Sequence, residues 1–331
     1  MRPQILPPNV LTHFYAGGPR IAALRGLDGV TDRMPEEWIA AVNTTFGAQD
    51  GRGLSRLADG TLVRDAIAAD PEAWLGAEHV ARYGDDPALL TKLLDAGQRL
   101  PVHFHPGRAL AARELGLTHG KTEAWIIVEA EPGAAVWVGF AEAVDEDTVR
   151  GWMNAQDGAA MLAAMRELPV AAGDVILVPA GTPHAIGDGI LLVELQEPTD
   201  LSVCLEWEQF GLTEEQARLG MKWDVALEAL DRTGWDEARL AGIRGPRDAR
   251  NLMPAAADPY FRAERVQAGD ELDAGFSVLI GLEGDGALGE LAFGRGSTAI
   301  IPHSAGPLTL EGNAAGIRCR PPDPAAPEGE W

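Results

Sequence analysis

Short runs rich in aliphatic, β-branched and aromatic residues follow one another through the middle of the chain, with Gly or Pro between most of them. They cover residues 102–105, 122–129, 134–140, 174–179 and 189–195. Strands of this length and spacing predict an antiparallel sandwich or barrel. A second group of such runs predicts a second all-β unit. Its members are residues 276–282, 287–293, 297–302 and 308–310.

Three segments outside these runs have a helical pattern. They are residues 62–75, 145–168 and about 213–241. In the second segment, Val149, Trp152 and Met153 recur at spacings of three and four, as on one face of a helix. The third begins with Thr213 followed by Glu, Glu and Gln, which resembles a capping box. The periodicity of residues 87–96 fits either a helix or a buried strand.

The composition is that of a folded protein with a strongly acidic balance. Of 331 residues, 46% are hydrophobic, which excludes a disordered chain and provides for a sizeable core. Asp and Glu number 50 against 27 Lys and Arg, so the formal net charge is −23. Nucleic acid and anionic membranes would be repelled, and we expect neither as a partner. The same field disfavours a phosphorylated substrate unless a local basic pocket overrides it.

No segment predicts export or membrane insertion. The first 16 residues lack the charged and apolar regions of a signal peptide, and no apolar run approaches the roughly 18 residues of a membrane helix. Cys204 and Cys319 lie far apart and form no Cys-x-x-Cys motif, which fits a reducing compartment. We therefore expect a cytoplasmic protein. We expect the Pro-rich tail from residue 320 to lie over the surface or to be disordered.

Two histidine motifs carry the candidate chemistry. His103 and His105 are two apart in a predicted strand, so their side chains share one face and could begin a metal site. Alone, such a pair is more often incidental than functional. Residues 173–184 add the stronger pattern Gly-x5-Pro-x-Gly-x2-His, in which Gly181 permits a tight turn before His184. The two motifs in this order are the signature of the cupin barrel.

Several further blocks, in the same order, resemble the type I phosphomannose isomerases. They are residues 92–96, 100–106, 120–125, 130–133, 179–187 and 194–196. The resemblance implies a mainly β fold of two cupin (jelly-roll β-barrel) domains with a helical insertion. We expect a catalytic metal-binding domain at residues 1–252 and a cupin-like domain at residues 253–331. In the second domain Pro307 occupies the place of the ligand histidine, so we expect no metal there.

The resemblance implies a set of metal ligands. The family uses a Gln, a His two residues later, a Glu and a second His. The matching positions here are His103, His105, Glu123 and His184, so that His replaces the Gln. Three imidazoles and a carboxylate suit a divalent ion; the family implies one zinc ion, and the substitution leaves Mn, Fe or Ni open. We interpret the other histidines as surface or core residues. They are His13, His79, His119 and His303.

The resemblance also indicates which residues surround the sugar. Glu194 is a candidate acid–base group, and Lys121 is a candidate catalytic and substrate-binding residue. Gln196 and Trp38 are candidate sugar contacts. Alternation along the predicted strand places Glu194 and Gln196 on one face. The alternatives are that Glu194 is a solvated strand charge and that Lys121 only neutralises a neighbouring carboxylate.

One departure from the family bears on the substrate. The family has an Arg considered catalytic where this chain has Cys204, and Glu206 and Glu208 follow. We interpret Cys204 as a small buried residue, since no base is evident near it. The sequence favours an aldose–ketose isomerase that moves a proton through an enediol on a neutral or otherwise non-standard sugar. The alternatives are a metal cupin that epimerises or dehydrates a sugar or keto-sugar, and a non-catalytic sugar-binding cupin. We expect a small-molecule sugar as the ligand, and a monomer or homodimer.

Overall fold

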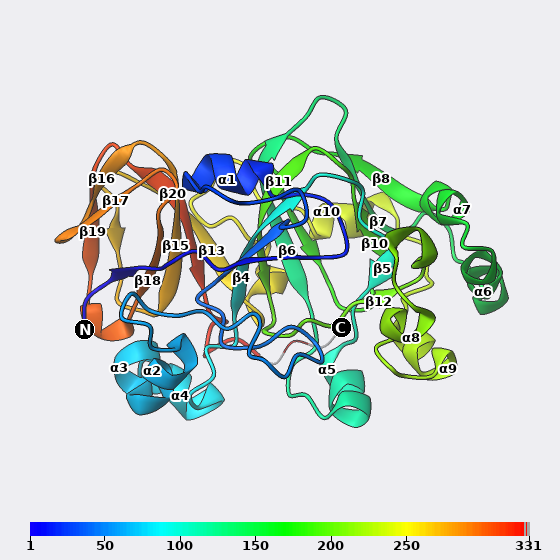
Figure 1. Cartoon of the computed structure of the whole chain (residues 1–331), viewed down its shortest axis with the longest axis horizontal. Coiled ribbons are helices and arrows are strands. Elements are labelled where there is room, and N and C mark those ends of the chain that lie inside the picture. Colours follow the sequence, from blue (N-terminus) through cyan, green and yellow to red (C-terminus); the bar gives the residue numbers. More distant parts are fainter. Residues whose placement is uncertain (328, 330–331) are drawn as a thin grey trace.

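The structure is a computed structural model that describes residues 1–327 and 329, and it is mainly β, as the sequence predicts. The strands between residues 10 and 204 form two antiparallel sheets in the centre and right of Figure 1. The first sheet has the order β2 (Val10–Leu11), β3 (Glu36–Ile39), β4 (Leu90–Ala96), β11 (Ile190–Gln196), β6 (Glu123–Ala130) and β9 (Val175–Val178). The second has the order β12 (Val203–Cys204), β5 (His103–Phe104), β10 (His184–Ile186), β7 (Ala135–Phe140) and β8 (Met165–Pro169).

The other strands form two further antiparallel sheets, at the left of Figure 1. The larger has the order β1 (Gln4–Ile5), β18 (Thr298–Ile301), β15 (Ser277–Glu283), β20 (Ala315–Arg320) and β13 (Arg262–Gln267). The smaller has the order β14 (Glu271–Leu272), β19 (Leu308–Gly312), β16 (Asp285–Leu288) and β17 (Leu291–Gly294). The N-terminal strand β1 therefore pairs with a strand from the far end of the sequence, and the domain boundary at residue 253 stays a prediction.

Apolar side chains from the first two sheets meet in one large core. Leu93, Trp125 and Leu191 of the first sheet belong to the same buried cluster as Val136 and Ile186 of the second. All seven positions of β4 are buried, which settles residues 87–96 in favour of a central strand. A strand covered on both faces loses the alternation that would distinguish it from a buried helix.

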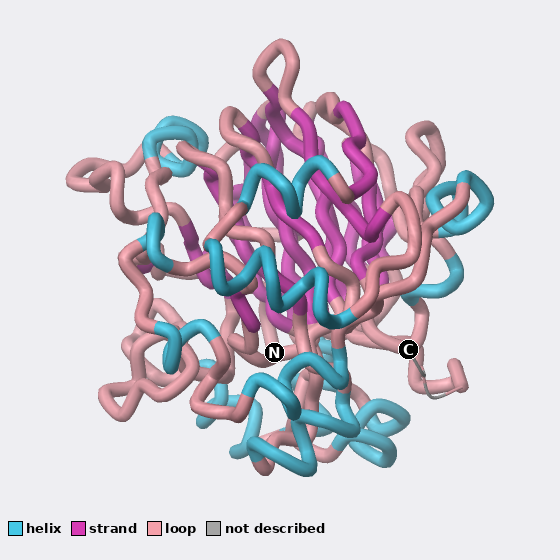
Figure 2. The backbone as a smooth tube through the Cα atoms, turned by 90° about the vertical axis from the view of Figure 1, so that its right-hand side faces the viewer, coloured by secondary structure: helices cyan, strands magenta, loops and turns pink. Residues whose placement is uncertain are grey.

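Short helices lie around the sheets, as Figure 2 shows from the side. The first group is α1 (Pro19–Arg25), α2 (Val63–Ala69), α3 (Pro71–Leu75), α4 (Ala77–Tyr83), α5 (Arg108–Leu110) and η1 (Ala111–Leu115). The second is α6 (Glu146–Ala155), α7 (Gly158–Ala163), η2 (Glu208–Phe210), α8 (Glu214–Ala217), α9 (Trp223–Ala226), η3 (Leu227–Ala229), α10 (Glu237–Gly242), η4 (Ala255–Ala257) and η5 (His303–Ala305).

The predicted helix at 213–241 is wrong as a continuous element. The capping box at Thr213 is present and begins α8, but that helix ends at Ala217. Leu219 and Gly220 then adopt positive φ angles of 55° and 74°, which an α-helix does not accommodate. The remaining residues form the separate short elements α9, η3 and α10.

The predicted helix at 145–168 is right only in its first part. The chain leaves α6 at Gln156, which has a positive φ of 51°, and α7 ends at Ala163. Met165 and Leu168 belong instead to strand β8, which pairs with β7. The predicted helix at 62–75 is likewise interrupted, because Pro71 begins a new helix capped by Asp70.

The C-terminal residues that the structure describes lie over the surface, one of the two expected arrangements for the tail. Arg82 of α4 donates to the carbonyl oxygens of Pro324 and Ala326. The Asp323 amide donates to the carbonyl oxygen of Asp258. Within the described residues, no helix is long and apolar enough to cross a membrane.

Candidate metal centre and catalytic pocket

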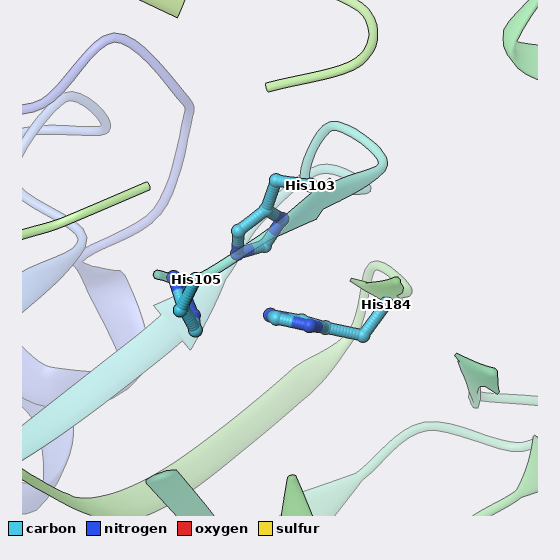
Figure 3. Close-up of side chains that lie close together, drawn as sticks. All are labelled: His103, His105 and His184. Atoms are coloured by element: carbon cyan, nitrogen blue, oxygen red, sulfur yellow. The ribbon is translucent and has the colours of Figure 1, made fainter. Parts of the chain in front are cut away.

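Three histidines converge because two strands of the second sheet pair in a specific register. β5 and β10 are antiparallel neighbours, with His103 opposite His184. His105 follows β5 directly, so its side chain returns to the same face two residues after His103. The candidate ligand atoms of the three imidazoles all lie within 4.8 Å of one another, and Figure 3 shows the rings pointing toward one another.

The backbone fixes the orientation of each imidazole ring. His103 Nδ1 lies 2.8 Å from the Pro101 carbonyl oxygen, and His184 Nδ1 lies 2.8 Å from that of Thr182. His105 Nδ1 lies 2.6 Å from the Leu201 carbonyl oxygen. A carbonyl can only accept, so each Nδ1 is the protonated nitrogen and each Nε2 keeps a lone pair. This is the arrangement that proteins use to orient metal-binding histidines.

Burial keeps the three imidazoles in the neutral form that binds metal. Burial lowers the pKa of His105 and His184 to about 3, and repulsion by Lys121 and by the neighbouring imidazoles adds to the effect. The pKa of His103 is also well below its ordinary value, for the same reasons. The free imidazole is the ligating species, so no proton has to be displaced when a metal binds.

Glu123, at the start of β6, completes the group. Its carboxylate oxygens lie 3.0 Å from His105 Nε2 and 3.4 Å from His184 Nε2. Burial alone would raise its pKa, but Lys121 and His105 outweigh burial and hold the pKa well below the ordinary value. Among the described residues, the buried His184 Nε2 has no hydrogen-bond partner. Three neutral imidazoles, one carboxylate and an unpartnered ring nitrogen fit a divalent metal ion.

A chain of buried ion pairs runs from this centre across the first sheet. Lys121 Nζ lies 2.8 Å from Glu123 and 3.7 Å from Glu194. Lys92 Nζ lies 3.4 Å from the same Glu194 oxygen and 3.3 Å from Glu36. All five side chains are at most 6% exposed, so each charge depends on its neighbours for stability. Glu194 is therefore not a solvated strand charge.

Within this chain of charges, Glu194 remains the candidate acid–base group. Burial raises its pKa to about 7, and the lysines on either side only partly offset that effect. A group with such a pKa can both accept and release a proton near neutral pH.

Lys92, Glu36 and Tyr15 are part of the pocket, although the sequence did not identify them as site residues. Lys92 on β4 lies between Glu194 on β11 and Trp38 on β3 in the strand register. The Tyr15 hydroxyl donates to Glu36 Oε1. A usable signal exists in the sequence, because Lys92 and Glu36 are charged residues within segments that are otherwise rich in apolar residues.

Trp38 and Gln196 lie behind the pocket wall. Trp38 is fully buried, and its indole N–H donates to Glu36 Oε2 at 2.7 Å. The Gln196 amide nitrogen donates to the Glu197 and Thr199 carbonyl oxygens. Neither residue lines the cavity described below. Their role as sugar contacts therefore stays a prediction, and in this structure Trp38 instead contacts Glu36.

The cavity has two parts that meet at a neck. The inner chamber, of about 40 Å³, is bordered by Glu36, Lys92, His103, Lys121, Glu123 and Glu194. The outer chamber, of about 600 Å³, lies between residues 12–14, 45–52 and 212–220. Residues that line both chambers form the neck: His13, Phe14, Asp200, Ser202 and Cys204. His13 was expected on the surface or in the core, but it lies in this neck.

Cys204 is part of the cavity wall, and its thiol has low reactivity. It pairs with His103 between β12 and β5 and is 3% exposed. Burial raises the pKa of its thiol to about 12, so the reactive thiolate is scarce at neutral pH. This agrees with the interpretation of Cys204 as a small buried residue.

Comparisons with known proteins agree with the geometry of the site. No protein-family model matches the chain. It is 34% identical over 188 residues to a mannose-6-phosphate isomerase of Streptococcus mutans, and that alignment covers 56% of this chain and 54% of the relative. The chain thus spans about half the length of that relative. It is 28% identical over 242 residues to the mannose-6-phosphate isomerase ManA of Bacillus subtilis, covering 70% of this chain and 74% of that one.

Solved structures share the whole fold at lower identity. The mannose 6-phosphate isomerase of Bacillus subtilis superposes with a TM-score of 0.77 at 20% identity, covering 97% of this chain and all of that one. A putative mannosephosphate isomerase of Archaeoglobus fulgidus gives 0.73 at 19% identity, with 97% and 98% covered. A mannose 6-phosphate isomerase bound with zinc and yttrium gives 0.71 at 16% identity, with 98% and 100% covered. The predicted cupin fold is confirmed.

Proposed function

We propose, from the premise that the chain belongs to the type I phosphomannose isomerase family, that it is a metal-dependent isomerase interconverting an aldose and a ketose. One observation carries the proposal: two of the candidate metal ligands, His103 and Glu123, line the same small chamber as the buried carboxylate of Glu194. The reaction needs both, a group that polarises the sugar oxygens and a base that moves a proton between neighbouring carbons. The name of the Streptococcus mutans relative supports the same reaction.

His103, His105, His184 and Glu123 would hold one divalent ion. Zinc is the ion we propose, because it suits nitrogen and oxygen ligands and because a structural neighbour was crystallised with it. Mn, Fe and Ni also suit this ligand set. When bound, the ion supplies Lewis-acid polarisation of the oxygens on C1 and C2 of the sugar.

Glu194 would carry the proton in both directions. As a carboxylate it would take the proton from C2 of the aldose, and as the resulting acid it would return that proton to C1. Between these two steps the hydroxyl proton of O2 moves to O1, so that C2 carries the carbonyl and C1 the hydroxyl of the ketose. Its pKa of about 7 keeps both forms accessible at neutral pH. Lys121 would donate to a sugar oxygen from its position between Glu123 and Glu194, and Lys92 would hold the Glu194 carboxylate in place.

The charges around the cavity support a neutral sugar as the substrate. Four carboxylates, including Asp200 of the neck, and two lysines line the inner chamber, a formal charge of −2 that one divalent ion would only neutralise. Beyond the neck, the outer chamber adds one arginine, Arg52, and one carboxylate, Glu215. Cys204 lies in the neck without a cationic group to offer. Neither chamber concentrates the cations that a phosphate dianion would need.

A comparison of sugars tests the reaction and the substrate together. The metal-loaded protein is incubated with mannose, glucose and mannose 6-phosphate, and ketose formation is measured. We expect turnover of a free aldose and an advantage over the phosphorylated sugar. Failure of every aldose would overturn the isomerase proposal. Efficient turnover of mannose 6-phosphate alone would overturn only the neutral substrate.

The variant Cys204→Arg sharpens the test of the substrate. A cation in the neck should raise the ratio of kcat/KM for mannose 6-phosphate to that for mannose by about tenfold or more. Cys204→Met is the matched control, because it adds volume without charge. Equal ratios in the two variants would show that the charge of the neck does not select the substrate.

Solvent deuterium separates isomerisation from the two alternatives. An enediol reaction that exchanges with solvent places deuterium at C1 of the ketose or C2 of the aldose. Epimerisation would yield a second aldose and dehydration a deoxy product, each with a distinct NMR spectrum. Saturable sugar binding without deuterium incorporation or product would support a non-catalytic binding protein instead.

A further inference from the structure

We propose that the outer chamber binds a second sugar ring, so that the substrate is an aldose at the reducing end of a disaccharide or short oligosaccharide. The inference rests on the proposed isomerase function and names its substrate class. Reaction at C1 and C2 engages only the reducing end. A sugar linked through O4 would therefore extend away from the inner chamber, through the neck and into the outer one.

The sizes of the two chambers motivate this inference. The inner chamber of about 40 Å³ has space for little more than the reacting end of a sugar. The outer chamber of about 600 Å³ equals the liquid volume of roughly twenty water molecules and lies within the usual range for ligand pockets. A single hexose that reaches the metal ligands would leave much of that space to water.

An exposed aromatic ring lines the outer chamber. Phe46 is 43% exposed, and within the described residues the only other exposed large apolar side chain is Met1 at 48%. Its backbone is nevertheless held in place, because the Phe46 amide donates to Asp200 Oδ2 at 3.0 Å. Asp200 lies in the neck, so the backbone of Phe46 is anchored beside the entrance of the inner chamber. A solvent-facing aromatic ring at this place suits stacking against the apolar face of a sugar.

The other walls of the outer chamber combine apolar surface with uncharged hydrogen-bonding groups. Phe14, Leu212 and Leu219 provide the apolar surface. The hydroxyl and amide groups come from Thr12, Thr45, Ser202 and Gln216. Such groups recognise the hydroxyls of a neutral sugar without requiring charge on the ligand. Gln216 also caps α8 through its Oε1, which fixes its position at the rim.

His13 supplies an unused polar atom in the neck. Its Nδ1 is buried and has no hydrogen-bond partner among the described residues. The ring is held against Phe14 and Tyr15, with centroid separations of 5.2 and 5.1 Å, and its Nε2 lies 3.6 Å from Glu36. A buried nitrogen without a partner is unfavourable until a ligand pairs with it. A hydroxyl of the ring that passes the neck would satisfy it.

Kinetics with matched sugars test the inference. The metal-loaded protein is assayed with mannose and 1,4-linked mannobiose, and with glucose and cellobiose. We expect kcat/KM for the better disaccharide to exceed that for its monosaccharide by about tenfold. In Phe46→Ala the ratio of disaccharide to monosaccharide kcat/KM should fall by about the same factor. Phe46→Tyr, which keeps the ring, should preserve it.

Saturation-transfer NMR adds a readout that does not depend on turnover. Signals of the non-reducing ring of mannobiose should receive saturation from the native protein and lose most of it in Phe46→Ala. Suppose that monosaccharides are turned over, but that disaccharides are not and their second ring receives no saturation. That result would overturn this inference and leave the isomerase proposal intact. Contact of both rings without turnover of any aldose would overturn the proposed function and keep the second subsite.

Discussion

His184 lies directly opposite His103 in the pairing of β10 with β5, and their ring centroids are 4.0 Å apart. In sequence the strands β6, β7, β8 and β9 lie between the two residues. A slip of one residue in this register would turn one imidazole to the opposite face of the sheet. The metal centre therefore depends on strand register as much as on residue identity.

The ligand assignment predicts metal content directly. We expect His184→Ala and Glu123→Ala to lower metal affinity by more than about a hundredfold, because each removes one of four donors from a buried site. Metal per chain is measured by mass spectrometry after dialysis against a weak chelator. His303→Ala is the matched control, since His303 lies on η5, and it should retain the metal. Undiminished metal in Glu123→Ala would remove Glu123 from the ligand set.

Glu194 should determine the acid side of the pH–rate profile. Glu194 acts as a base only when it is ionised, so kcat/KM should fall as pH decreases through its pKa. Without a metal ion nearby, that pKa is about 7, above the ordinary value of 4.5, and a bound cation would lower it. Glu194→Gln should lose about a hundredfold or more in kcat and still bind metal.

The stability of Glu194→Gln should change in the opposite direction to its activity. A carboxylate whose pKa is raised on folding destabilises the folded state as pH rises above 4.5. The metal-free variant should therefore unfold at a temperature at least as high as that of the native protein at pH 8. A large loss of stability with unchanged kcat would show that Glu194 is structural.

Lys92 should be essential for stability because it separates two buried carboxylates. Lys92→Met leaves Glu36 and Glu194 without their shared cation, and we expect a loss of about 3–5 kcal/mol in the free energy of unfolding. Urea unfolding at pH 7 measures it. The double variant Lys92→Met/Glu36→Gln should recover part of the loss, and strict additivity of the two changes would argue against the ion pair.

His119 should stabilise the protein at neutral pH through its charge. The imidazole lies 2.7 Å from Asp86 and 3.8 Å from Glu197, and these carboxylates outweigh burial and raise its pKa to about 9. The contribution of this charge to the free energy of unfolding is complete below the ordinary pKa of 6.5 and disappears as pH rises through 9. His119→Gln should cost about 1–3 kcal/mol at pH 6 and little above pH 10, by urea unfolding.

His79 provides the matched control for the charge of His119. Burial lowers the pKa of His79, so that it is neutral over the same range of pH. The effect of His79→Gln on the free energy of unfolding should therefore not depend on pH between 7 and 10. A similar alkaline dependence in both variants would mean that the charge of His119 is not responsible.

Local signals predicted much of the fold. The β runs of both halves are present, because strand pattern and turn residues are properties of a few neighbouring residues. The capping box at Thr213 also formed as predicted. The predicted length of that helix is wrong, because the left-handed backbone at Leu219 and Gly220 prevents the helix from continuing. The pairing of β1 with β18 was not predicted either, since it joins the two ends of the chain.

The candidate histidines belong to two local motifs, whereas Glu123 was named only through the resemblance to the phosphomannose isomerases. The structure brings His103, His105, His184 and Glu123 together. The roles of Lys92, Glu36 and His13 were not predicted. Each role depends on contacts with residues of other segments, and a single sequence does not show which segments become neighbours.

The sequence by itself determined the strand-rich pattern and supplied the candidate ligands and the position of Cys204 as predictions. Only the tertiary structure decided that Lys92 lies between two carboxylates, that Trp38 lies behind the pocket and that Phe46 faces an open chamber. The physical reason is range. Propensity and motif spacing act over a few residues, whereas burial, ion pairing and cavity shape arise from segments that meet only after the sheets pair and pack.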